Sequence, residues 1–135
     1  MSLTYNCIQL NCDFSSAATL LLENYLISNN VDLCFVQDVY CSRKGLGMSL
    51  SPPDFTGFNV YFSAKPEEIP KVALYTSKRI SCSIISQASD SHCVTCKISS
   101  KNSNYTLLSS IYSPPSDTSS VLRTQRLFNN LKRVR

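Results

Sequence analysis

Three strand-like segments, spread along the chain, each end in polar side chains. Their sequences are Ile-Gln-Leu-Asn at 8–11, Phe-Val-Gln-Asp-Val-Tyr at 35–40 and Ser-Ile-Tyr-Ser-Pro-Pro at 110–115. Functional groups at the ends of successive strands can converge on one site although they lie far apart in sequence. The pattern therefore predicts a single site built from strand ends.

The first two segments belong to a strand, helix, strand pattern. Residues 5–10 have the apolar character of a strand, and Asp-Phe-Ser-Ser at 13–16 offers N-cap candidates for a helix over 16–28. A second buried strand follows at 32–37. We expect a parallel strand pair whose connecting helix covers one face of a sheet. The apolar residues of that helix, at three- and four-residue spacings, are Ala18, Leu21, Leu22, Tyr25 and Leu26.

The rest of the chain predicts further strands. Residues 41–56 contain two glycines and two prolines without a sustained period, which indicates a loop near the strand ends. Polar turns between the later strands favour an antiparallel meander and a mixed sheet. A last helix is expected after Pro114-Pro115, capped by residues 116–118. The later strand-like runs are 58–62, 71–76, 92–98 and 105–112, with a further candidate at 82–85.

Length and composition allow one globular core. The chain has 135 residues, of which 43% are hydrophobic and 16% charged, and it is too short for two ordinary domains. No apolar run approaches the roughly 18 residues that suggest a membrane span, so no membrane partner is expected. Because the N-terminus has no basic residue before an apolar stretch, we expect no secretory signal and an intracellular protein, nuclear or cytoplasmic.

The seven cysteines do not indicate a disulfide framework. Their number is odd, and Cys7, Cys34, Cys93 and Cys96 lie inside apolar strand-like runs, so buried reduced thiols are the preferred interpretation. Cys93 and Cys96 have the C-x-x-C spacing of half a zinc site or a redox pair. Positions three apart in a strand face opposite sides, and the sequence holds one histidine, so zinc is not expected.

The order of these segments resembles the first half of the endonuclease/exonuclease/phosphatase superfamily, most closely the endonuclease domain of non-LTR retrotransposons. The resemblance spans nearly the whole chain. It implies an α/β fold of the α+β type, namely the N-terminal part of a two-sheet α/β sandwich with mixed sheets and flanking helices. The matching elements are the strand ending in Leu10-Asn11, residues 32–40 ("D-[apolar]-QE-x-Y" in the family), the strand at 71–74 and residues 112–115 ("Y-x-P-P").

The family's reaction is divalent-metal-dependent hydrolysis of a DNA phosphodiester, so the resemblance implies Mg²⁺ as cofactor and DNA as partner. It assigns Asp38 to the metal-ligand carboxylate, Asn11 to the asparagine that organises metal and phosphate, and Tyr112 to the tyrosine beside the scissile phosphate. Each residue alone has a structural interpretation: Asn11 as an Asx-turn, Asp38 as a solvated acid and Tyr112 as a half-buried sheet residue. Their shared order favours an inherited site. Gln37 and Tyr40 are expected to be structural neighbours.

Two departures from the family limit the expected activity. The family has glutamate where this chain has Asp38, and the shorter side chain withdraws the carboxylate by roughly one bond length. The family's "G-D-x-N" and "S-D-H" elements, which supply further ligands and the histidine base, have no counterpart in this sequence. We therefore expect residues 1–135 to form one partial domain that lacks the C-terminal catalytic half, is inactive by itself and self-associates through an exposed sandwich face.

Two other functions stay open at this point. One is a non-enzymatic module that binds nucleic acid or protein, and the other is a phosphatase-type member of the same superfamily. The net charge is +4, and no acidic residue follows Asp117. The basic residues after it can contact phosphates, but we prefer them as the solvated face and last turn of the final helix. They are Arg123, Arg126, Lys132, Arg133 and Arg135.

The segment Ser-Asp-Ser-His at 89–92 has the composition of the missing histidine element. It precedes a mid-chain strand, however, and one residue separates Asp90 from His92, whereas the two are adjacent in the family's element. We therefore interpret it as an exposed turn that leads into a strand.

Overall fold

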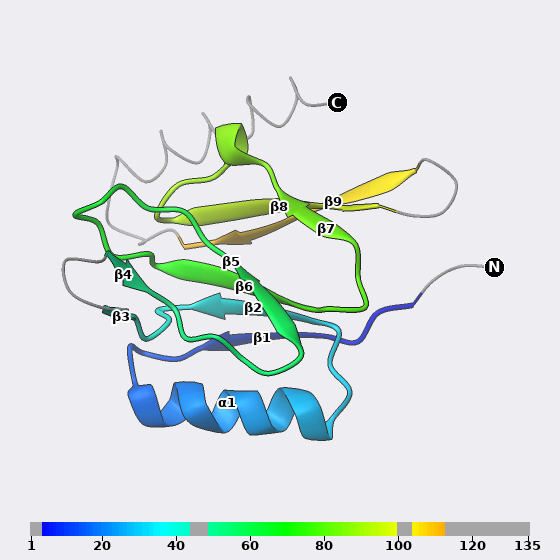
Figure 1. The fold of residues 1–135 in the computed structure, drawn as a ribbon, viewed down its shortest axis with the longest axis horizontal. Coiled ribbons are helices and arrows are strands. Elements are labelled where there is room, and N and C mark those ends of the chain that lie inside the picture. Colours follow the sequence, from blue (N-terminus) through cyan, green and yellow to red (C-terminus); the bar gives the residue numbers. More distant parts are fainter. Residues whose placement is uncertain (1–3, 44–48, 100–103, 113–135) are drawn as a thin grey trace.

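The computed structural model describes residues 4–43, 49–99 and 104–112 (Figure 1). The predicted last helix, with its basic residues, lies outside the described residues. In chain order the elements are β1 (Cys7–Asn11), α1 (Ser16–Ser28), β2 (Leu33–Gln37), β3 (Ser42–Arg43), β4 (Leu50–Ser51), β5 (Phe58–Tyr61), β6 (Val72–Ser77), β7 (Cys82–Ile84), the 3₁₀ helix η1 (Ser86–Ala88), β8 (Cys93–Ser99) and β9 (Tyr105–Ile111).

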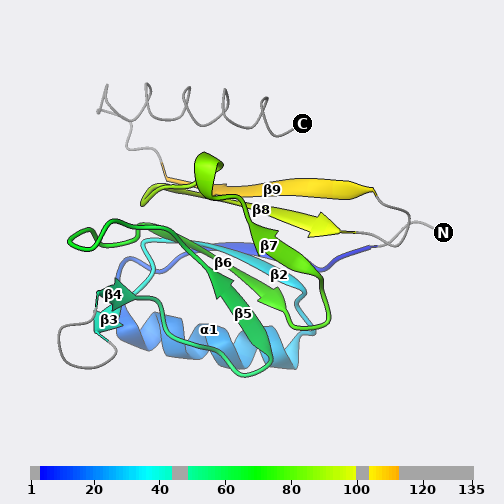
Figure 2. The same ribbon diagram turned by 45° about the horizontal axis from the view of Figure 1, so that its top comes forward.

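The first sheet is mixed and has the strand order β1-β2-β6-β5. β1 runs parallel to β2, with Asn11 opposite Gln37, and β2 pairs antiparallel with β6. This confirms the predicted strand, helix, strand opening, and α1 covers one face of the sheet (Figures 1 and 2). Because β1 and β2 are parallel, their C-terminal ends lie at the same edge of the sheet. The N-terminal end of β6 lies at that edge too.

The helix α1 has the predicted bounds, Ser16–Ser28, and a serine hydroxyl caps its N-terminus. Leu22 and Leu26 are buried against the sheet, whereas Leu21 and Tyr25 are 69% and 50% exposed. The helix therefore packs through a narrower stripe than the sequence predicts, and it presents apolar side chains to solvent. In the part of the chain that the structure describes, no helix is long and apolar enough to cross a membrane.

A second sheet packs on the face of the first sheet that α1 leaves uncovered (Figure 2). It is antiparallel and consists of β7, β8 and β9. Between the sheets, Val72 and Leu74 of β6 pack with Val94 of β8. On the other face of β6, Ala73 and Tyr75 join the apolar cluster beneath α1. The fold is thus the predicted two-sheet α/β sandwich, with β6 buried on both faces.

The structure differs from the sequence prediction in how the later strands are divided. They do not form one meander, because β5 and β6 belong to the first sheet and β7 to β9 form the second. The physical reason is that β6 is apolar on both faces, so the strands after it cover its second face instead of extending its sheet. Within the predicted loop at 41–56, β3 and β4 pair as a short antiparallel ribbon.

All seven cysteines are free thiols. Cys34, Cys93 and Cys96 are buried as predicted, but Cys7 is exposed because β1 is the outermost strand of its sheet. Burial raises the pKa of Cys34 to about 12 and that of Cys93 to about 11. Cys96 faces the space between the sheets, whereas the Cys93 thiol donates to the Ala88 carbonyl oxygen of η1. Among the described residues, no three metal-ligating side chains gather in one place.

Candidate functional site

Asp38 directly follows β2, and its backbone is held from two sides. Its N–H donates to the Lys71 carbonyl oxygen at 2.7 Å, and its own carbonyl accepts the Phe14 N–H at 2.8 Å. Asp38 has φ +49°, in the left-handed region that residues with side chains seldom adopt. Asp13 and Phe14 are left-handed as well, at +50° and +56°. Such unfavourable backbone conformations are typical of functional sites.

Asn11, the last residue of β1, contacts the Asp38 side chain. Its Nδ2 donates to Asp38 Oδ2 at 3.4 Å, and its Oδ1 accepts the Asp13 N–H at 2.8 Å. The second bond is the Asx-turn that the sequence offered as an alternative role. The Asn11 side chain therefore shapes the turn and contacts the Asp38 carboxylate, while its role toward metal and phosphate stays a prediction.

Asp38 is not the solvated acid that the alternative interpretation required. Its side chain is 9% exposed, and its Oδ1 is buried without a hydrogen-bond partner among the described residues. A buried carboxylate oxygen is costly unless a cation or a donor compensates it. A carboxylate oxygen without a partner is a ligand of the type that Mg²⁺ binds. Because the Asn11 oxygen is engaged at Asp13, the described residue that would hold the ion is Asp38.

Tyr112 lies at the same end of the sandwich as Asp38. Backbone hydrogen bonds connect the two sheets there: Asp38 donates to Lys71, and Lys71 donates to Ser91, each at 2.7 Å. The N–H of Tyr112 donates to the carbonyl of His92, the next residue, also at 2.7 Å. The Tyr112 ring packs against the apolar cluster between the sheets, and its centroid is 5.7 Å from that of the His92 ring. The half-buried position of Tyr112 is thus confirmed.

A row of polar side chains joins the three strands that carry the site residues. Gln9 Nε2 donates to Gln37 Oε1 at 3.2 Å, and Gln37 Nε2 donates to Ser110 Oγ at 3.4 Å. These residues lie on β1, β2 and β9, so the row crosses from the first sheet to the second. It fixes β9 against β2 just before the strands end. The sequence signal for this row was a glutamine at the end of an apolar, buried strand, and Gln37 is a structural neighbour of the site.

The segment before β8 is a turn, as predicted, but it is not exposed. The Asp90 carboxylate accepts the His92 N–H at 2.8 Å, and Ser91 is 4% exposed. The Ser91 hydroxyl donates to Glu68 Oε2 at 3.3 Å and lies 2.9 Å from His92 Nδ1. The pairing of β8 with β9 sets His92 beside Tyr112, which sequence reasoning missed.

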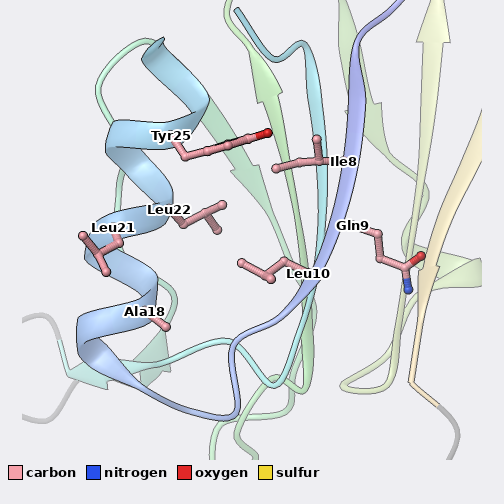
Figure 3. Close-up of a pocket in the computed structure, with 7 residues that line it drawn as sticks. All are labelled: Ile8, Gln9, Leu10, Ala18, Leu21, Leu22 and Tyr25. Carbon is pink, nitrogen blue, oxygen red and sulfur yellow. The ribbon is translucent and has the colours of Figure 1, made fainter. Parts of the chain in front are cut away.

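An apolar groove of about 510 Å³ lies between β1 and α1 (Figure 3). Ile8 and Leu10 point from β1 toward the helix, whereas Gln9 points to the opposite face of the sheet. The groove is therefore separate from the strand-end site. In the described part of the chain, the outer edge of β1 has no strand beside it. An apolar surface and an open strand edge are the features that predicted self-association, and that association stays a prediction.

The fold described above is similar to that of a solved endonuclease domain. The structure matches the endonuclease domain of TRAS1, described as a telomere-specific non-LTR retrotransposon, with a TM-score of 0.71 and 18% sequence identity. The match covers 97% of this chain and 52% of that one, so this chain spans about half the length of the solved structure. No protein-family model and no curated protein matches the sequence. The resemblance found in the sequence is thus confirmed at the level of the fold.

Proposed function

We propose that this chain supplies one side of a divalent-metal-dependent phosphodiesterase site that acts on DNA. The buried Oδ1 of Asp38, without a partner among the described residues, is the observation that carries the proposal. The fold shared with a retrotransposon endonuclease domain supports a nucleic-acid phosphodiester as substrate. In this role residues 1–135 would form one part of a larger catalytic domain. The protein would be intracellular, in the nucleus or the cytoplasm.

Each of the three predicted site residues has a separate task in this proposal. Asp38 would hold Mg²⁺, and the bound ion would neutralise the charge that develops on the phosphate. Asn11 orients the Asp38 carboxylate through the hydrogen bond from its amide. Tyr112 offers its phenolic hydroxyl to a phosphate oxygen at the same end of the sandwich. Because these residues lie at the ends of three strands, the two packed sheets support their positions.

We also propose that the 135-residue chain alone does not cleave DNA. The sequence lacks the further elements that bind metal and phosphate in the resembling family, together with that family's histidine base. Asp38 is one methylene shorter than the glutamate of that family. Hydrolysis needs a group that takes a proton from water, and a half-site without it loses the corresponding rate enhancement, about 10²–10⁴-fold.

Nicking of supercoiled plasmid in Mg²⁺ or Mn²⁺ tests this proposal. The purified chain and its Asp38→Asn variant are expected to leave equal amounts of intact plasmid. Nicking by the chain that disappears in Asp38→Asn would contradict the half-site. In that case His92→Asn would be the next variant, because His92 lies beside Tyr112. Absence of both cleavage and metal binding would remove the support for the metal site itself.

A further inference from the structure

Phe14 combines three features that packing alone does not explain. The residue is 43% exposed, its backbone is left-handed at φ +56°, and its N–H donates to the carbonyl of Asp38. A bulky residue with positive φ is unfavourable, and glycine or asparagine would occupy this turn at lower cost. A side chain that is 43% exposed returns only part of the free energy that full burial would give. The position therefore holds an aromatic side chain at an energetic cost to the fold.

Lys71 lies next to this ring, and its backbone is also hydrogen-bonded to that of Asp38. Its ammonium nitrogen is 4.8 Å from the centroid of the Phe14 ring, the geometry of a cation–π contact. Its carbonyl accepts the Asp38 N–H, while the Asp38 carbonyl accepts the Phe14 N–H. The backbones of Phe14 and Lys71 are thus both hydrogen-bonded to that of Asp38. One of these residues supplies a partly exposed aromatic ring and the other a cation.

We propose that Phe14 and Lys71 form a nucleotide-binding subsite. This inference rests on the proposed function and specifies which form of nucleic acid is the substrate. The ring stacks on one unpaired base, and the ammonium binds the phosphate that adjoins this base. Exposed aromatic rings bind single-stranded nucleic acid in this way, because every base offers a π-face. An ammonium has three N–H donors, so contact with a ring leaves donors that can reach a phosphate oxygen.

The subsite requires a base that is out of the duplex stack. In a paired duplex both faces of a base are covered by its neighbours, so the Phe14 ring cannot reach them. Its fixed relation to Asp38 sets the bound base beside the phosphodiester that the proposed metal site would engage. The expected ligand is therefore a single-stranded or locally unstacked segment of nucleic acid.

Fluorescence anisotropy with labelled oligonucleotides of about eight nucleotides tests this subsite. The probes are a normal single strand, a strand of the same length with abasic sugars, and a duplex. The wild-type chain is expected to prefer the normal strand over the other two. Phe14→Leu should weaken binding of the normal strand by about 5- to 150-fold, as expected when one base loses an aromatic partner, and should leave abasic binding unchanged. Phe14→Trp should retain the preference.

Two further variants separate stacking from charge and from general surface effects. Lys71→Gln should weaken binding of the normal and abasic strands alike and should lower the salt dependence by about 0.7 in log–log slope. Tyr25→Leu removes another exposed aromatic side chain, on α1, and should change nothing. Unfolding midpoints of all variants show whether each remains folded.

The outcomes distinguish this subsite from the proposed function. Equal binding of normal and abasic strands by the wild type, or unchanged binding by Phe14→Leu, would overturn the subsite and leave the phosphodiesterase proposal standing. No binding of any oligonucleotide at low salt would count against both. A preference for the duplex would contradict the requirement for an unpaired base.

Discussion

Replacing Asp38 by asparagine is expected to stabilise the metal-free protein, although the residue lies in the proposed site. Asparagine has nearly the same shape, accepts φ +49°, and removes the buried charge whose Oδ1 lacks a partner among the described residues. Leaving a buried polar group unpaired costs roughly 1–3 kcal/mol, and more when it is charged. If the neutral amide removes part of that cost, the free energy of unfolding rises by about 1 kcal/mol. The melting temperature then rises by about 3 °C.

Mg²⁺ is expected to reverse the order of stability of the two proteins. At about 10 mM Mg²⁺, a site with a Kd of about 1 mM stabilises the wild type by about 1.4 kcal/mol. Asp38→Asn lacks the charged ligand and gains nothing. The assay is urea or thermal unfolding of both proteins in EDTA and in Mg²⁺ at one ionic strength, so that general charge screening is equal.

Asp32→Asn is the matched control, because Asp32 is a carboxylate with satisfied oxygens at the other end of β2. Its Oδ2 accepts the Asn6 N–H at 2.8 Å, and its Oδ1 pairs with Arg79 at 3.2 Å. Loss of this partly exposed ion pair should cost under about 1 kcal/mol and should leave the Mg²⁺ response intact. The reasoning is refuted if Asp38→Asn is less stable than the wild type in EDTA, or if Mg²⁺ stabilises all three proteins equally.

Three further predictions concern the core, the thiols and the groove. Leu26→Ala should lower the free energy of unfolding in urea by about 2–5 kcal/mol because Leu26 of α1 is fully buried against the sheet, and a loss below about 1 kcal/mol would contradict that packing. Burial raises the pKa of Cys34 from 9.0 to about 12, so the unfolded chain loses this proton at lower pH than the fold does. Stability should therefore fall as pH rises from 9 to 12, and Cys34→Ala should make the decline shallower by up to about 1.4 kcal/mol per pH unit. Leu21→Glu, beside the apolar groove, should shift self-association measured by analytical ultracentrifugation toward monomer at an unchanged unfolding midpoint, whereas unaltered association would assign it to another surface.

The opening of the fold could be predicted from the sequence because its signals are local. A serine before residue 16 and two asparagines after residue 28 mark the ends of α1, and a short apolar run marks β2. The division of the later strands between two sheets has no such local signal. It depends on the packing of Val72 and Leu74 against Val94, whose contact exists only after the chain has turned back on itself.

The site was predictable as a set of strand ends but not in its geometry. The order of Asn11, Asp38 and Tyr112 located three residues at one end of the sandwich. No sequence pattern indicated the left-handed backbone of Asp38, since it depends on hydrogen bonds to residues more than twenty positions away, Phe14 and Lys71. The position of His92 beside Tyr112 had no sequence signal either, because it depends on the pairing of β8 with β9.

Paramagnetic broadening by Mn²⁺ of the backbone amide signals in an isotope-labelled chain tests the central claim most directly. A divalent ion at the strand-end site should broaden first the amides of Asp38, Asn11 and Phe14, because Asn11 and Phe14 are both hydrogen-bonded to Asp38. Asp38→Asn should abolish this selective broadening, while Asp32→Asn should retain it. Broadening centred on another part of the chain, or unchanged in Asp38→Asn, would contradict the assignment of Asp38 as a metal ligand.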